Sequence, residues 1–114
     1  MGDQVRQRQV PIIGEGQGVY SFVHIEDAAT ATAAALECLP GAYNIVDGNP
    51  SPQHVWLTAF ARAVGAPAPP RISEEEALRG SGPDAVYYAT RIRGASNEKA
   101  RRELGFHPRP LEWI

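Results

Sequence analysis

Three glycines at alternate positions, Gly14, Gly16 and Gly18, constrain this chain more than any other part of its sequence. A glycine-rich loop that binds a dinucleotide follows a strand, precedes a helix and has the spacing G-x-G-x-x-G. Here the position that this spacing reserves for the third glycine is valine, and a β-type run follows in place of a helix. Because the glycines lie between two β-type runs, residues 9–13 and 19–25, they predict a β-hairpin turn and not a phosphate-binding loop.

The rest of the chain alternates between helical and β-type patterns. An alanine-rich stretch that Pro40-Gly41 stops, a stretch with Ser51 as its cap and Pro52 at the first helical position, and a Ser73–Glu76 capping box each predict a helix. Helices are expected at 28–39, 51–64, 73–80 and 96–104, with one further short strand at 42–46. Residues 84–92 fit either a helix or a strand, and a helix is favoured. This order predicts an α/β fold made of a β-hairpin, one further short strand and several helices. Residues 1–114 are expected to form a single domain.

Two residues at the start of the alanine-rich helix, Asp27 and His24, are of types that often have functional roles. Asp27 directly precedes the helix, and its carboxylate can accept hydrogen bonds from the free N–H groups of the first turn, so it is predicted to be the N-cap. His24 has no second histidine or cysteine at metal-ligand spacing. We therefore expect His24 to be a packed strand histidine that is hydrogen-bonded near the helix start, and we predict no metal site.

Composition excludes several functional classes. The net charge of −2 gives no basic surface for nucleic acid. No apolar run approaches the roughly 20 residues that cross a bilayer, and the first residues lack the apolar core of a secretory signal. The single cysteine, Cys38, cannot form an internal disulfide bond. We therefore expect a cytoplasmic protein that binds neither nucleic acid nor a membrane.

Four stretches, taken in order, resemble the C-terminal portion of the extended short-chain dehydrogenase/reductase family, the NAD-dependent epimerases and dehydratases. They are PIIGEGQGVYSFVHIEDAATATAAALE, GAYNIVDGNPSPQHVW, FARAVGAP and GASNEKARRELGFHP. The resemblance covers nearly the whole chain and is weakest over residues 66–90. It implies the substrate-binding lobe of an enzyme whose N-terminal Rossmann domain holds NAD or NADP and a catalytic Tyr-x-x-x-Lys pair.

Neither the glycine-rich cofactor loop nor the catalytic pair occurs in this sequence. Each tyrosine is followed, four positions later, by a residue other than lysine, and the sole lysine is Lys99. Without this lysine, hydride transfer lacks its general acid. We expect the chain alone to have no catalytic residues, to bind no NAD(P) and to be inactive. The alternative is a non-catalytic binding or regulatory module derived from the same family.

The resemblance also suggests substrate-binding residues. Arg91, Arg93 and Asn97 lie where the family brings its last loop beside the substrate pocket. Tyr20 stands where nucleotide-sugar epimerases usually have an arginine that binds the diphosphate. Because a neutral tyrosine cannot form those bonds, we expect a smaller or more apolar small-molecule substrate.

The resemblance has a consequence for partners. In the family, the strand at 42–46 joins the edge of the Rossmann sheet. Without that sheet, the strand would expose unpaired backbone groups and apolar side chains. We therefore expect the chain either to bind the missing Rossmann domain or to self-associate through this surface.

Overall fold

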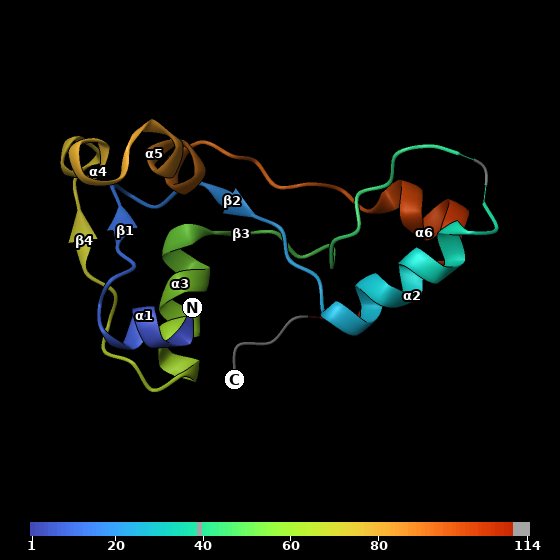
Figure 1. Ribbon diagram of the computed structural model, residues 1–114, viewed down its shortest axis with the longest axis horizontal. Helices are drawn as coiled ribbons and strands as arrows, with labels where there is room; N and C mark the ends of the chain where they lie inside the picture. The colour runs from blue at the N-terminus through green and yellow to red at the C-terminus, as the bar shows by residue number, and fades with distance from the viewer. Residues whose placement is uncertain (39, 111–114) are drawn as a thin grey trace. The chain divides into compact units, whose positions relative to one another are not determined.

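The computed structural model describes residues 1–38 and 40–110 and has an α/β architecture of helices and short strands (Figure 1). The described residues form two compact units. Unit 1 comprises Met1–Tyr20 and Ser51–Arg93, and unit 2 comprises residues 21–38, 40–50 and 94–110. Each unit has its own core and is described by itself. The single domain over residues 1–114 stays a prediction.

The short strands of unit 1 form two separate pairs. β1 (Ile12–Ile13) pairs in parallel with β4 (Arg71–Ile72), and β2 (Val19–Tyr20) pairs in antiparallel fashion with β3 (Ser51–Pro52). The predicted β-hairpin is therefore wrong, because the strands on either side of the glycines have different partners. The glycine segment carries the chain from one pair to the other and does not reverse it between neighbouring strands.

Four helices complete the described part of unit 1. They are α1 (Gly2–Arg6), α3 (Gln53–Ala63), α4 (Glu74–Ser81) and α5 (Pro83–Thr90), and α4 and α5 lie side by side (Figure 1). Ala77 of α4 and Ala89 of α5 are buried against Ile13 of β1. Their small side chains let both helices approach the strand closely.

Local signals set most helix boundaries of unit 1. The hydroxyl of Ser73 accepts a hydrogen bond from the N–H of Glu76 (3.1 Å), which confirms the predicted start of α4. Pro83 begins α5, which confirms the helical reading of 84–92, although the helix ends at Thr90. α3 begins at Gln53 and ends at Ala63. Its N-cap is Pro52, so the predicted cap at Ser51 is wrong, since Ser51–Pro52 form β3.

Unit 2 contains two helices, α2 (Ile25–Ala35) and α6 (Glu98–Leu104), which pack on each other. Ala31 and Ala100 are buried at their contact together with Phe106. The predicted end of α6 is confirmed, because Gly105 adopts the left-handed conformation (φ 64°) that favours glycine.

The start of α2 differs from the prediction. The strand expected at 19–25 ends at Tyr20, and α2 already begins at Ile25. His24 is the N-cap, because its Nδ1 accepts a hydrogen bond from the N–H of Glu26 (3.1 Å). The prediction that Asp27 caps the helix is wrong, since Asp27 lies within the first turn. The expected hydrogen-bonded role of His24 near the helix start is confirmed.

Two other expectations for unit 2 also differ. α2 ends at Ala35, before the predicted end at residue 39, which lies outside the described residues. Residues 42–46 form no strand, since no described segment of the chain pairs with them. Extended backbone becomes a strand only when a neighbouring strand accepts and donates its hydrogen bonds.

Candidate functional site

The glycine segment places its carbonyl groups against the start of α3. The oxygens of Gly18 and Gly16 accept hydrogen bonds from the N–H groups of Gln53 (2.8 Å) and His54 (3.0 Å). These N–H groups belong to the first turn of the helix, where no partner exists inside the helix. A phosphate at this helix start would need the same donors. The segment is therefore a cap for α3 and not a phosphate cradle.

Gly18 also approaches the end of α5. Its N–H donates to the carbonyl oxygen of Ala89 (2.9 Å). A Cβ atom at this position would overlap the carbonyl oxygen of Tyr88 and lie 2.7 Å from the carbonyl carbon of Ala89. Any larger residue would push these backbone segments apart. The glycine is thus required by close packing between β2 and α5.

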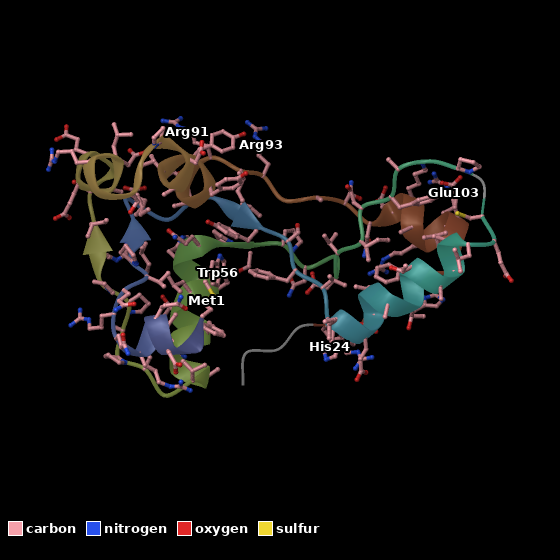
Figure 2. All side chains as sticks on the ribbon, in the orientation of Figure 1. Met1, His24, Trp56, Arg91, Arg93 and Glu103 are labelled. Atoms are coloured by element: carbon pink, nitrogen blue, oxygen red, sulfur yellow. The ribbon has the colours of Figure 1, made fainter. Side chains whose placement is uncertain are left out.

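A cavity of about 430 Å³ opens where α5 ends, and we call it the arginine cavity. The N–H of Val19 donates to the carbonyl of Ile92 (2.7 Å), and Val19 forms a parallel bridge with Arg93, which fixes the backbone around the cavity. Arg91 and Arg93 are both exposed, and Figure 2 shows Arg91 close to α5 and Arg93 farther along the chain. The arginine cavity is lined by Gln17, Val19, Thr90, Arg91, Ile92 and Arg93.

A second cavity, of about 350 Å³, shares Gln17, Thr90 and Arg91 with the first. Two carboxylates, Glu15 and Glu74, line it, and we call it the glutamate cavity. Among the described residues, neither Arg91 nor Arg93 belongs to an ion pair. These two adjoining cavities of unit 1 therefore differ in charge. The charged side chains of the arginine cavity are both positive, whereas the glutamate cavity has one positive and two negative side chains.

Tyr20 lies in the same unit as the two arginines but does not line either cavity. Its ring packs on Trp56, with 5.0 Å between the ring centroids and planes tilted by 55°. Burial raises the pKa of the Tyr20 hydroxyl, so this group stays neutral at physiological pH. The structure thus places Tyr20 in a packing contact with α3.

Asn97 belongs to unit 2, where its side chain is buried. Its amide nitrogen donates to the carbonyl oxygen of Val46 (2.8 Å), and its amide oxygen accepts from Nε of Arg101 (2.9 Å). Gly48 follows with φ 79°, and a Cβ there would lie 3.1 Å from the Asn97 amide nitrogen. Asn97 therefore holds the turn at residues 46–48 against α6.

Asp27 forms the densest set of polar contacts in the described part of unit 2, all of them with Arg109. The backbone N–H of Arg109 donates to Oδ2 (2.8 Å), and Nη2 donates to Oδ1 (3.0 Å). The neighbouring Glu26 accepts from Nη1 at 3.1 Å. The hydrogen bonds from the Arg109 backbone and side chain hold the pKa of Asp27 below its usual value. The sequence patterns did not predict that Arg109 binds Asp27. The only local feature that marks Arg109 is its position between Pro108 and Pro110.

Lys99 and Tyr43 are close, but they do not reproduce a catalytic tyrosine–lysine pair. The ammonium group lies over the face of the ring, 4.5 Å from its centroid, and donates to the carbonyl oxygen of Ala42 (2.9 Å). A hydrogen bond with Cys38 is the main cause that raises the pKa of Tyr43. The contact is a cation–π interaction with the face of the ring.

The described residues offer neither a metal site nor a membrane-spanning helix. No group of three or more histidine, cysteine, aspartate or glutamate side chains is placed to hold a metal ion. Within residues 1–38 and 40–110, none of the helices has the length and apolar character to cross a membrane.

Two curated proteins are similar to this chain. It is 37% identical over 106 residues to a 3-diazoavenalumate denitrifying reductase from Streptomyces, an alignment that covers 92% of this chain and 35% of the reductase. It is 29% identical to a 2-alkyl-3-oxoalkanoate reductase from Stenotrophomonas maltophilia, which covers 95% of this chain and 41% of that protein. The chain thus spans little more than a third of the length of these relatives. No protein-family model matches it.

Solved structures give the same result. A conserved protein of unknown function from Silicibacter pomeroyi matches 91% of this chain and 38% of its own length, with a TM-score of 0.69 and 30% identity. The human epimerase family protein SDR39U1, solved with NADPH, matches 96% and 38%, with a TM-score of 0.75 and 19% identity. A UDP-glucuronic acid 4-epimerase from Bacillus cereus, solved with NAD, matches 96% and 32%, with a TM-score of 0.64 and 18% identity. The last two likenesses show the fold alone.

These matches define a class: the chain is similar in sequence to part of two reductases, and it shares its fold with part of epimerases of the extended short-chain dehydrogenase/reductase family. The part of that family that it resembles is the C-terminal portion, as its four motifs indicated.

Proposed function

We propose that this chain is the substrate-side lobe of an NAD(P)-dependent reductase of this family and does not catalyse hydride transfer by itself. The main support is the sequence similarity to the Streptomyces reductase. The two sequences are 37% identical over 92% of this chain, and the match covers 35% of that reductase. The catalytic Tyr-x-x-x-Lys and the cofactor loop do not occur in the 114 residues. The only lysine contacts the face of Tyr43, which supports the absence of an acid–base pair.

The glycine segment supports the same conclusion about the cofactor. Its carbonyl oxygens accept hydrogen bonds from the first N–H groups of α3, so these N–H groups are not free to bind a phosphate. NAD or NADP would be held by residues outside this sequence. The solved family members with NADPH and with NAD support a nicotinamide cofactor for an intact protein.

The relatives also support a substrate class. The names of both curated relatives denote anions of carboxylic acids, an avenalumate and an oxoalkanoate. A small carboxylate agrees with neutral Tyr20, which offers no charge for a nucleotide diphosphate. Arg91 and Arg93 supply free positive charge in unit 1, while the Asn97 amide is used inside unit 2.

The exposed face of α2 supports a partner for unit 2. Ile25 and Leu36 are 80% and 86% exposed, and Ala29 and Ala33 are exposed on the same stripe between them. An apolar stripe of this kind marks a surface that another element covers. We propose that a nucleotide-binding domain covers it, and that copies of this chain self-associate through it when that domain is absent.

The test compares the chain with a chimera. In the chimera, this chain replaces the matching segment of the Streptomyces reductase. By calorimetry, the chain alone should show no saturable binding of NADH or NADPH, whereas the chimera should melt cooperatively and bind one of them. An unrelated soluble domain of equal length, inserted at the same place, is the control. Micromolar binding by the chain alone, or a chimera that behaves like the control, would overturn the proposal.

A further inference from the structure

We propose that the arginine cavity binds the carboxylate of a singly charged organic anion through Arg91 and Arg93. This inference rests on the proposed function, because it gives the substrate of that function a binding site and a charge. The residues that carry it all belong to unit 1, so the site needs no residue of unit 2.

Backbone contacts near the cavity fix the main chain that carries both arginines. The N–H of Arg91 donates to the carbonyl oxygen of Tyr87 (2.8 Å) at the end of α5, and Arg93 bridges Val19 of β2. The two arginines are separated by one residue and line the same cavity. Since no described carboxylate pairs with either, both retain donors for a ligand. Guanidinium groups match the geometry of a carboxylate.

The remaining lining fits the organic part of such a ligand. Val19 and Ile92 contribute apolar side chains between the polar ones. The hydroxyl of Thr90 donates to the carbonyl oxygen of Val86 (2.6 Å), so its donor is already used. The cavity thus combines positive charge with partly apolar walls, as an anion with a hydrocarbon or aryl body requires.

The glutamate cavity limits the charge of the ligand. It shares Arg91 with the arginine cavity and adds Glu15 and Glu74. The two carboxylates offset the two guanidinium groups, so the combined lining has no net charge. A monoanion can remain at the arginines, whereas a ligand with two or more negative charges brings the excess charge toward the glutamates. Mutual repulsion of like charges then disfavours a diphosphate.

The test titrates the intact chain with benzoate, and with neutral benzamide and pyrophosphate as comparison ligands. Calorimetry gives the affinities, and backbone NMR shifts locate the site. We expect benzoate to bind with a dissociation constant on the order of millimolar, as small ligands do at open sites. Shifts should centre on residues 17–19 and 90–93. Benzamide and pyrophosphate should bind more weakly.

Variants then assign the contacts. Arg91→Gln and Arg93→Gln should each weaken benzoate binding by about two- to fivefold, the range for exposed charge pairs. Arg71→Gln, an exposed arginine outside both cavities, should leave it unchanged. Glu74→Gln should strengthen pyrophosphate binding, whereas Glu75→Gln, whose side chain lines neither cavity, should not.

Three results would overturn the inference: no saturable benzoate binding, equal binding of benzamide, or equal losses in Arg71→Gln and the two cavity variants. Melting curves of the variants should match the wild type, because the substituted arginines are exposed. Failure of this test is distinguishable from failure of the proposed function, since the chimera reports cofactor binding and folding.

Discussion

Nη2 of Arg109 lies 3.0 Å from Oδ1 of Asp27, and the backbone N–H of the same arginine lies 2.8 Å from Oδ2. One carboxylate near the start of α2 therefore fixes both the main chain and the side chain of a residue far along the sequence. The Asp27 side chain is only 11% exposed, which sets this pair apart from ordinary surface ion pairs.

The Asp27–Arg109 contact predicts a pH dependence of stability. Because the pKa of Asp27 is lowered in the folded chain, the contact stabilises the fold above the ordinary carboxyl pKa of about 4. This stabilisation is lost as the pH falls through the lowered pKa. Asp27→Asn should reduce the melting temperature at pH 6, and the difference from the wild type should shrink below about pH 4.

A matched control is Asp3→Asn, which removes an ion pair with Arg6 at 2.9 Å whose side chains are 89% and 51% exposed. It should change the melting temperature little at any pH, because exposed pairs contribute little. A constant difference between Asp27→Asn and wild type from pH 6 to pH 3 would contradict this assignment.

Two glycine substitutions should act in opposite directions. Gly18→Ala places a Cβ against the backbone of Tyr88 and Ala89, so we expect a loss of about 2 kcal/mol or more in the free energy of unfolding. Gly80→Ala lies inside α4, where nothing approaches its Cβ within 4 Å, and should gain about 0.5–1 kcal/mol. Urea unfolding measures both, and equal effects would refute the close-packing role of Gly18.

Gln53 should be more important for stability than its polarity suggests. β4 pairs with one edge of β1, and the buried side-chain oxygen of Gln53 accepts from the N–H of Ile13 (3.1 Å). Gln53→Leu leaves this buried N–H without an acceptor, so we expect a loss of about 1–3 kcal/mol in the free energy of unfolding. Gln17→Leu, which removes an exposed bond to Glu15, is the control and should have a smaller effect. A larger loss in the control would contradict the role of Gln53.

The exposed stripe of α2 predicts self-association of the isolated chain. Sedimentation velocity should show mass that increases with concentration, and Ile25→Glu with Leu36→Glu should abolish this increase, because charge opposes burial of the stripe. Leu78→Glu, at a site 52% exposed on α4 of unit 1, should leave association unchanged. A wild-type chain that stays a monomer over the whole range and melts cooperatively would contradict the prediction.

Signals that act within a few residues were read correctly from the sequence. The Ser73 cap and Gly105 at the end of α6 depend on backbone groups within about one helical turn. The site was predicted less completely. Arg91 and Arg93 do share a cavity, but their combination with Val19, and the nearby Glu15 and Glu74, joins segments that are distant in sequence.

The sequence by itself determined the family resemblance, the α/β class and most helices, because residue spacing and capping are local properties. Only the tertiary structure decided that the glycines cap α3, that β1 and β2 pair with different strands, and that Asp27 binds Arg109 in place of capping α2. Each of these contacts joins groups more than 30 residues apart, and hydrogen-bonding groups choose among distant partners only when the chain has packed.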